Sequence, residues 1–259
     1  MDSSLLTQIS VLSRRSVVRT LRQPAMVIPS LIFPMMLLAV NAGGLTSATE
    51  LPGFPADTYL DFAFAFPLMQ SAMFGATLAG SEFARDIENG FLNRLALTPM
   101  SPAALLAGLL SGVIALALIQ AAVFLTVGLV IGVDIKSGFL GVPVLVALSV
   151  LTSLGFGCLG TILALRTGSG EAVQSFFPLF FVGIFFSSIS LPRELLGGGW
   201  FEAVATVNPV SYLVEGMRSL VITGWDAQAL ALGFGFAVAL FAAGLFGASI
   251  SMRTRMERT

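Results

Sequence analysis

Side chains that could carry out chemistry are scarce in this sequence. It has no histidine, a single cysteine, Cys158, and a single lysine, Lys136. A phosphate-binding loop of the form GxxxxGK[ST] needs a glycine before its lysine, but Ile135 precedes Lys136. The carboxylates do not cluster at the spacing of metal ligands, and no nucleophile has a histidine base available. We therefore expect no catalytic residue, no metal site and no cofactor held by this chain.

One polar stretch, residues 82–99, interrupts an otherwise apolar sequence. Drawn as a helix, it has an apolar face formed at four-residue spacing by Phe83, Ile87, Phe91 and Leu95. The other faces carry polar side chains, namely Glu82, Arg85, Asp86, Glu88, Asn89, Asn93 and Arg94. This pattern is typical of an amphipathic helix at a membrane surface, where it could dock a soluble partner. The alternative is a solvated loop that only reverses the chain.

The overall composition predicts an all-α membrane protein. Of the 259 residues, 56% are hydrophobic and only 10% are charged, a balance that few soluble folds could accommodate. Apolar runs of about 20 residues can cross the roughly 30 Å hydrocarbon layer as helices, and no alternating pattern suggests a barrel. The net charge is −1 and the basic residues are dispersed, so we expect membrane lipid and no nucleic acid as a partner.

The apolar runs predict six transmembrane helices, at about residues 25–43, 58–81, 103–132, 138–165, 172–191 and 227–252. Residues 1–24 form a separate N-terminal helix along the membrane interface, because arginines there alternate with apolar side chains. Residues 25–259 make up the membrane domain. The predicted spans lack ionisable residues near mid-membrane, where one would cost about 2.5 to 3.5 kcal/mol. We therefore expect a partner to supply any driving force.

Residues 192–225 are too polar for an ordinary span and too apolar for an ordinary loop. Asn208 before Pro209 is typical of a helix start, with the asparagine as the cap and the proline in the first turn. We predict two short helices that re-enter the outer leaflet and break at Asn208. Glu215 and Arg218 are three residues apart and can form an ion pair on the second helix.

Glycine spacing predicts close helix packing at two places. Gly108, Gly112, Gly128 and Gly132 give two GxxxG spacings in the span at 103–132. The string from Gly155 to Gly160 matches the dinucleotide motif GxGxxG, but it lies inside an apolar span rather than after a strand. We interpret these glycines as packing residues.

The distribution of basic residues predicts the orientation. In the six-span arrangement, Lys136, Arg193 and Arg218 lie on one side and the other ten of the 13 basic residues lie on the side of both termini. Cytoplasmic segments carry the excess of Lys and Arg, so both termini are expected in the cytoplasm.

Two motifs resemble the ABC type-2 permease family, which forms the membrane subunits of bacterial exporters similar to those for daunorubicin-type drugs. The family's first pattern is an acidic residue, a glycine, Arg-Leu and then a proline-serine turn into a span. This sequence is similar to it in Glu88, Gly90, Arg94, Leu95, Pro99, Ser101 and Gly108. The second is similar to the family's NP...Y...E..R...G signature in Asn208, Pro209, Tyr212, Glu215, Arg218 and Gly224. The first motif departs from the family at Phe91, where threonine is common, and at Leu109, where lysine is common.

The resemblance implies the fold known as ABC type-2 or type V exporter, with a cytoplasmic coupling helix and two extracellular re-entrant helices. It implies a multi-pass permease in the bacterial plasma membrane, paired with a second permease copy or a homologous permease. Two cytosolic ATPase subunits would bind ATP and Mg, so the assembled complex rather than this chain would hydrolyse ATP.

The resemblance also implies roles for particular residues. Those expected to contact the ATPase are Glu82, Arg85, Asp86, Glu88, Gly90, Arg94 and Leu95. Those expected to shape the extracellular gate are Asn208, Pro209, Tyr212, Glu215 and Arg218. Those expected along the substrate path are Phe66, Met69, Phe177 and Phe181.

The function predicted from these observations is export of amphipathic drug or lipid-like substrates. Export of polysaccharide or glycolipid is the alternative within the family, although two Trp and two Tyr leave few rings to stack on sugars. An ATPase-independent channel or membrane scaffold is the alternative of another class.

Overall fold

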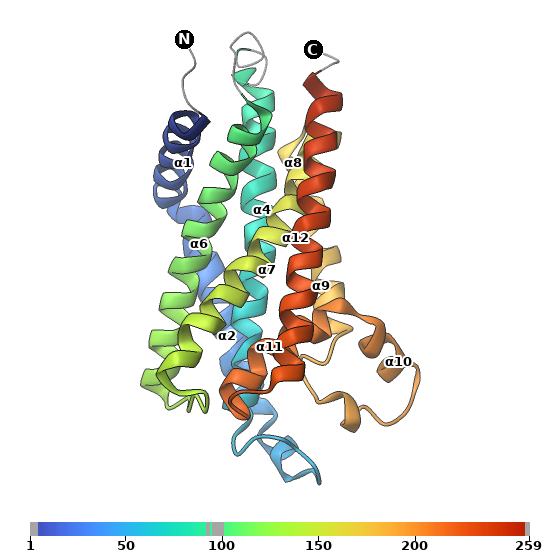
Figure 1. The fold of residues 1–259 in the computed structure, drawn as a ribbon. Coiled ribbons are helices and arrows are strands. Elements are labelled where there is room, and N and C mark those ends of the chain that lie inside the picture. Colours follow the sequence, from blue (N-terminus) through green and yellow to red (C-terminus); the bar gives the residue numbers. More distant parts are fainter. Residues whose placement is uncertain (1–4, 92–93, 95–100, 257–259) are drawn as a thin grey trace.

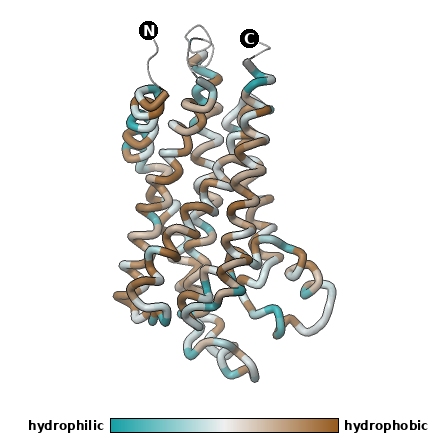
Figure 2. Tube along the Cα trace, in the orientation of Figure 1, coloured by the Kyte–Doolittle hydropathy of each residue, from teal (hydrophilic) through white to brown (hydrophobic). Residues whose placement is uncertain are grey.

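The computed structural model describes residues 5–91, 94 and 101–256 (Figure 1). In these ranges all regular structure is helical and no strand occurs. Five helical segments of the described chain are long and apolar enough to cross a membrane: α2 (Pro24–Gly44), α3 with α4 (Tyr59–Ala63 and Ala65–Glu88), α6 (Pro102–Ile131), α7 (Gly138–Thr167) and α12 (Ala227–Met256). They run side by side as a bundle, with hydrophobic residues along its middle and hydrophilic residues gathered at its ends (Figure 2).

The segment predicted as a sixth span, residues 172–191, is built differently. It consists of two short helices, α8 (Gly170–Ser175) and α9 (Phe177–Phe185), separated at Phe176. Pro178 lies in the first turn of α9 and has no N–H to continue the preceding helix. The helical part of this segment ends at Phe185 rather than at residue 191. The count of six spans therefore stays a prediction.

Helix α4 lies at the centre of the bundle. Of the most apolar stretch of the α3–α4 span, 89% is buried, compared with 17% for α2 and for α12. Leu68, Met69 and Met73 are fully enclosed by surrounding helices, and α4 packs against α7, α6, α2 and α11. The α3–α4 span is thus the one to which the rest of the bundle is attached.

The boundary of this central helix differs from the sequence prediction. The sequence predicts a span that ends at residue 81 and a separate amphipathic helix from Glu82. The structure instead shows one continuous helix to Glu88, followed by a turn in which Gly90 has a φ of +64°. Two carboxylates of this last stretch, Glu82 and Asp86, are covered by another helix instead of facing water, whereas Glu88 is exposed.

That covering helix is α1 (Leu5–Leu21), which packs along the first half of α6. Gly108 and Gly112 of α6 lie directly against Leu12 and Ser16, and the Ser16 hydroxyl donates to the Leu109 carbonyl at 3.2 Å. The predicted glycine contacts are confirmed at these positions and at Gly128, which lies against the Phe64 ring. The prediction is wrong for Gly132, which follows the end of α6 with a φ of +100° and where a Cβ would meet nothing within 4 Å. The position of α1 at a membrane interface stays a prediction.

Glycines of α7 serve packing in the same way. Gly160 lies against the backbone of Ala76 in α4, and Gly155 lies against Leu240 in α12. The interpretation of the GxGxxG match as a packing motif is confirmed.

At the far end of the bundle from the start of α1, the connections between spans form short helices. These are η1 (Thr46–Glu50), η2 (Arg193–Leu195), α10 (Trp200–Val207) and α11 (Pro209–Ile222). The predicted break between two helices at Asn208 is confirmed, and its side chain caps α11 by accepting from the Val210 amide at 3.0 Å. Their depth in a membrane stays a prediction.

The contact between α7 and α4 leads to the first testable prediction. A Cβ at Gly160 would overlap the Ala76 carbonyl, whereas one at Gly235, on the exposed side of α12, would meet nothing within 4 Å. We expect Gly160→Ala to lower the free energy of unfolding by about 1–3 kcal/mol. Gly235→Ala should raise it by up to about 1 kcal/mol through helix propensity. Thermal unfolding in detergent measures both, and equal effects of the two substitutions would contradict this packing.

Candidate functional site

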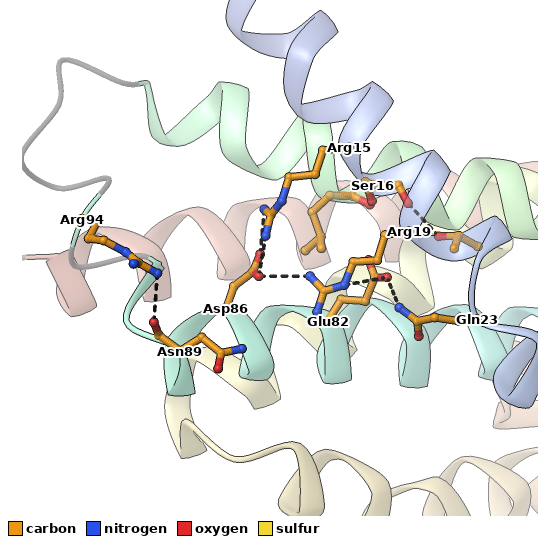
Figure 3. A network of polar contacts seen from close by, with 10 residues as sticks. Arg15, Ser16, Arg19, Gln23, Glu82, Asp86, Asn89 and Arg94 are labelled. Carbon is orange, nitrogen blue, oxygen red and sulfur yellow. Dashed lines mark hydrogen bonds and ion pairs between the residues drawn. The ribbon is translucent and has the colours of Figure 1, made fainter.

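The end of the bundle where α1 begins holds a network of buried charges between α1 and α4 (Figure 3). Arg15 donates two hydrogen bonds to the Asp86 carboxylate, at 3.1 and 2.8 Å. Arg19 donates to the same carboxylate at 3.0 Å, and its Nε lies 3.5 Å from Glu82 Oε1. Gln23 completes the set by donating to Glu82 at 3.1 Å. We call these five residues the α1–α4 ion network.

The carboxylates of this network are shielded from solvent. Glu82 is 2% exposed and Asp86 is 8% exposed. A buried carboxylate is tolerable only when cations and hydrogen-bond donors compensate its lost hydration. The paired arginines supply that compensation, so α1 and the end of α4 are held together by charge as well as by packing.

The residues expected to contact an ATPase therefore divide into two groups. Glu82 and Asp86 point to α1, whereas Arg85 and Glu88 on α4 and Arg94 beyond Gly90 are exposed. Gly90 ends the helix, and Leu95 lies outside the described residues. Sequence analysis missed the part played by α1. The signal for it was present, because Arg15 and Arg19 repeat at the same four-residue spacing as Glu82 and Asp86.

The opposite end of the bundle holds a second polar cluster around α11. Arg218 is only 4% exposed, and its guanidinium donates to the carbonyls of Phe62 at 3.0 Å, Ser188 at 2.9 Å and Ile189 at 2.7 Å. Its charge also stacks over the Phe62 ring, 3.6 Å from the ring centroid. Arg218 thereby ties α11 both to α3 and to the chain that follows α9.

Glu215 has a different partner from the one that sequence spacing predicts. Its carboxylate pairs with Arg193 at 2.6 Å and accepts from the Ser188 hydroxyl at 2.7 Å, so the predicted ion pair with Arg218 is wrong. Arg218 instead enters the core and donates to backbone carbonyls outside α11. Burial lowers the pKa of Arg193, but Glu215 and Tyr212 outweigh this and raise that pKa above its ordinary value.

The remaining motif residues of α11 fasten neighbouring segments. The Asn208 amide donates to the carbonyls of Gly183 at 2.6 Å and Phe186 at 2.9 Å, at the end of α9. Tyr212 donates to the Thr206 carbonyl at 2.8 Å, and its ring stacks on Phe236 of α12. The motif from Asn208 to Arg218 thus gathers α3, α9, α10 and α12 around α11.

The residues expected along a substrate path share one apolar cluster. Phe66 and Met69 are buried on α4. Phe177 and Phe181 are half-buried on α9, with ring centroids 5.1 Å apart. Phe177 also contacts Phe74 of α4, at 5.4 Å between centroids. Aromatic side chains therefore line the contact between α9 and α4.

Five apolar helices of spanning length, with a charged cluster at each end, define an integral membrane protein built of packed helices. Comparison with known proteins narrows this class. A family model for ABC-2 type transporters matches residues 7–222, which is most of the chain. The chain belongs to the ABC-2 type transporter family and is a permease of that family.

Similar proteins of known name agree with this assignment. The daunorubicin resistance ABC transporter permease protein DrrB1 of Streptomyces coeruleorubidus is 28% identical over 200 residues, which cover 75% of this chain and 66% of that protein. The putative transport permease ycf38 of Pyropia yezoensis is 26% identical over 223 residues, or 84% of this chain and 75% of the relative. The probable doxorubicin resistance ABC transporter permease protein DrrC of Mycobacterium tuberculosis (strain ATCC 25618 / H37Rv) is 27% identical over 157 residues, which cover 60% of this chain and 55% of that protein. The match to DrrB1 spans just under two thirds of that relative, and the match to DrrC just over half.

The Arg218 contacts lead to the second prediction. Arg218→Gln removes the group that satisfies three carbonyls, all of which belong to buried residues, namely Phe62, Ser188 and Ile189. We expect the free energy of unfolding to fall by about 3 kcal/mol, measured by thermal unfolding in detergent. Arg193→Gln is the matched control, because Arg193 is partly exposed and its ion pair should contribute about 1 kcal/mol or less. Equal losses in the two variants would contradict the anchoring role of Arg218.

Proposed function

We propose that this permease exports amphipathic drug or lipid-like molecules across a bacterial plasma membrane and is driven by a separate ATPase. Membership of the ABC-2 family supports the transport role, because permeases of that family work in ABC transporters. The names of two relatives as daunorubicin and doxorubicin resistance permeases support an amphipathic cargo. The two ATPase subunits of the proposed complex bind ATP and Mg, and two permeases form its membrane part.

The observation that carries this proposal is that the end of α4 has one face bound to α1 and another face with exposed charges. On its inner side Glu82 and Asp86 are locked to α1, while on its outer side Arg85, Glu88 and Arg94 face outward. Exposed charges of both signs next to a fixed helix end suit a protein interface, where charge complementarity selects the partner. We place the ATPase there, with this end and both termini in the cytoplasm.

The same helix offers a route for the movement that transport requires. A displacement of α4 by the ATPase would carry α1 with it through the α1–α4 ion network. At its other end the α3–α4 span meets Arg218 through the Phe62 carbonyl. The proposed extracellular gate is formed by Asn208, Pro209, Tyr212, Glu215 and Arg218, and through Arg218 it is linked by the α3–α4 span to the end of α4 where the ATPase is placed.

Docking on α4 leads to the third prediction. The triple variant Arg85→Glu, Glu88→Arg and Arg94→Glu should weaken ATPase binding about tenfold or more, because reversed charges face an unchanged partner surface. The measurement is affinity purification of the tagged permease in mild detergent, with mass spectrometry of the bound proteins. The control reverses an exposed ion pair at the other end of the bundle, Asp57→Lys with Lys136→Glu, whose charges lie 3.3 Å apart. This control should retain the ATPase fully.

Two outcomes would contradict the proposal in different ways. A stable preparation free of any ATPase would favour a channel or membrane scaffold. A complex whose ATP hydrolysis responds to lipid-linked sugars, but not to apolar amphiphiles, would favour export of polysaccharide or glycolipid.

A further inference from the structure

An open pocket of about 650 Å³ lies between the start of α2, the middle of α4 and the junction of α8 with α9. Its volume is in the range of sites that hold small molecules. The lining is divided by chemistry, with polar side chains toward the coupling end and apolar ones deeper in the bundle. The polar members are Arg22, Gln23, Thr77, Arg85 and Gln174, and the apolar ones include Met26, Pro29, Phe74 and Phe177.

The two arginines of this pocket differ from those of the α1–α4 ion network. Both Arg22 and Arg85 are exposed, and neither guanidinium has an ion pair or hydrogen bond with any described residue. The carboxylates closest in sequence to Arg85 are already engaged. Glu82 and Asp86 bind α1, and Glu88 accepts a hydrogen bond from the Gly170 amide at 3.1 Å. The pocket therefore carries two positive charges and has no acidic residue in its lining.

A polar stripe leads from this pocket into the core. Gln70, Phe74, Thr77, Ser81 and Arg85 follow one another at spacings of three or four residues, so they share one face of α4. The Gln70 amide and the Ser81 hydroxyl on this stripe are buried without a hydrogen-bond partner among the described residues. Such groups are rare in stable cores, because each loses its hydration without replacement. These two groups lie on the same face of α4 as Thr77 and Arg85, which line the pocket.

A neighbouring groove extends the positive surface along α1. This second pocket, of about 630 Å³, shares Arg22 and Gln23 with the first and is also lined by Arg14, Arg15 and Arg19. No acidic residue lines it. Arg15 and Arg19 are paired with Asp86 and Glu82, so the uncompensated charges of this groove are Arg14 and Arg22, which raise the local concentration of anions beside the first pocket.

We propose that the cargo of this permease is an anionic amphiphile, specifically a membrane lipid with a phosphate head, and that this pocket is where it is loaded. The phosphate is held by Arg22 and Arg85, and the apolar chains lie against Phe74 and Phe177. This inference rests on the export function proposed above and assigns its substrate class. Charge complementarity selects a lipid anion over a neutral or cationic amphiphile, because a cation would face two uncompensated arginines.

The test compares two lipids that share their acyl chains and differ in head charge. The full-length permease, stripped of lipid in detergent, is mixed with equal amounts of dioleoyl phosphatidylglycerol and dioleoyl phosphatidylcholine, and bound lipid is counted by native mass spectrometry. We expect the wild type to retain the anionic lipid about tenfold over the zwitterionic one. Arg22→Gln with Arg85→Gln should bring this ratio close to one, and lysine at both positions should restore most of it.

The matched control removes the same number of positive charges, at other residues, from the same end of the bundle. Arg166→Gln with Arg253→Gln alters two exposed arginines on α7 and α12 that line neither pocket. This variant should keep the tenfold ratio. Equal retention of both lipids by the wild type, or an equal drop in both double variants, would overturn the assignment of the pocket. Glycerol phosphate should not compete at equal concentration, and competition by it would assign the site to a free phosphate instead of a lipid.

A second measurement separates a transported lipid from one that is only bound. In nanodiscs holding the permease with its ATPase, phosphatidylglycerol should stimulate ATP hydrolysis several-fold in the wild type and not in the single variant Arg22→Gln, which leaves the proposed ATPase-docking residue Arg85 unchanged. Selective binding without stimulation would overturn the assignment as cargo. Absence of any copurifying ATPase would instead contradict the proposed function, and the lipid ratio measured on the permease alone does not depend on that result.

Discussion

The structure depends on the burial of a single span, α3 with α4, on nearly all sides. A helix in that position has little lipid or water to receive its polar groups, so they depend on protein partners, and Gln70 and Ser81 are its buried exceptions. Small residues of the neighbours, such as Gly160 against Ala76, allow the backbones to approach closely enough to exclude solvent. Charges and free carbonyls are unavoidable at the two ends of the span. Side chains from distant parts of the sequence therefore bind there.

The two ends of the α3–α4 span are stabilised by opposite arrangements of charge. At one end the span supplies the anions, Glu82 and Asp86, and α1 supplies the cations. At the other end the span supplies the Phe62 carbonyl and α11 supplies Arg218 as the donor. Both arrangements join elements that would otherwise meet only through apolar contacts, which constrain position less than directed hydrogen bonds do. The α3–α4 span is thereby fixed to α1 at one end and to α11 at the other.

The sequence predicts the spans well and the boundaries and partners less well. Apolar runs require helices whatever their neighbours are, so α2, α6, α7 and α12 could be placed from composition, and Asn208 could be identified as a cap from its proline. The end of α4 could not, because an amphipathic pattern is the same whether water or a charged helix covers its polar face. The same limit explains the error at Glu215, since spacing along one helix says nothing of Arg193 on another segment.

The basic residues near the α1–α4 ion network illustrate why the number of charges alone is a poor guide to a site. Arg15, Arg19, Arg22 and Arg85 are chemically identical, yet the first two are neutralised by carboxylates and the last two are not. The α4 carboxylates of the ion network are committed to α1, so they cannot compensate charges in the neighbouring pocket. The ion network that fixes α1 thus has a second effect, because it leaves Arg22 and Arg85 beside an apolar pocket as the charges free to recognise an anion.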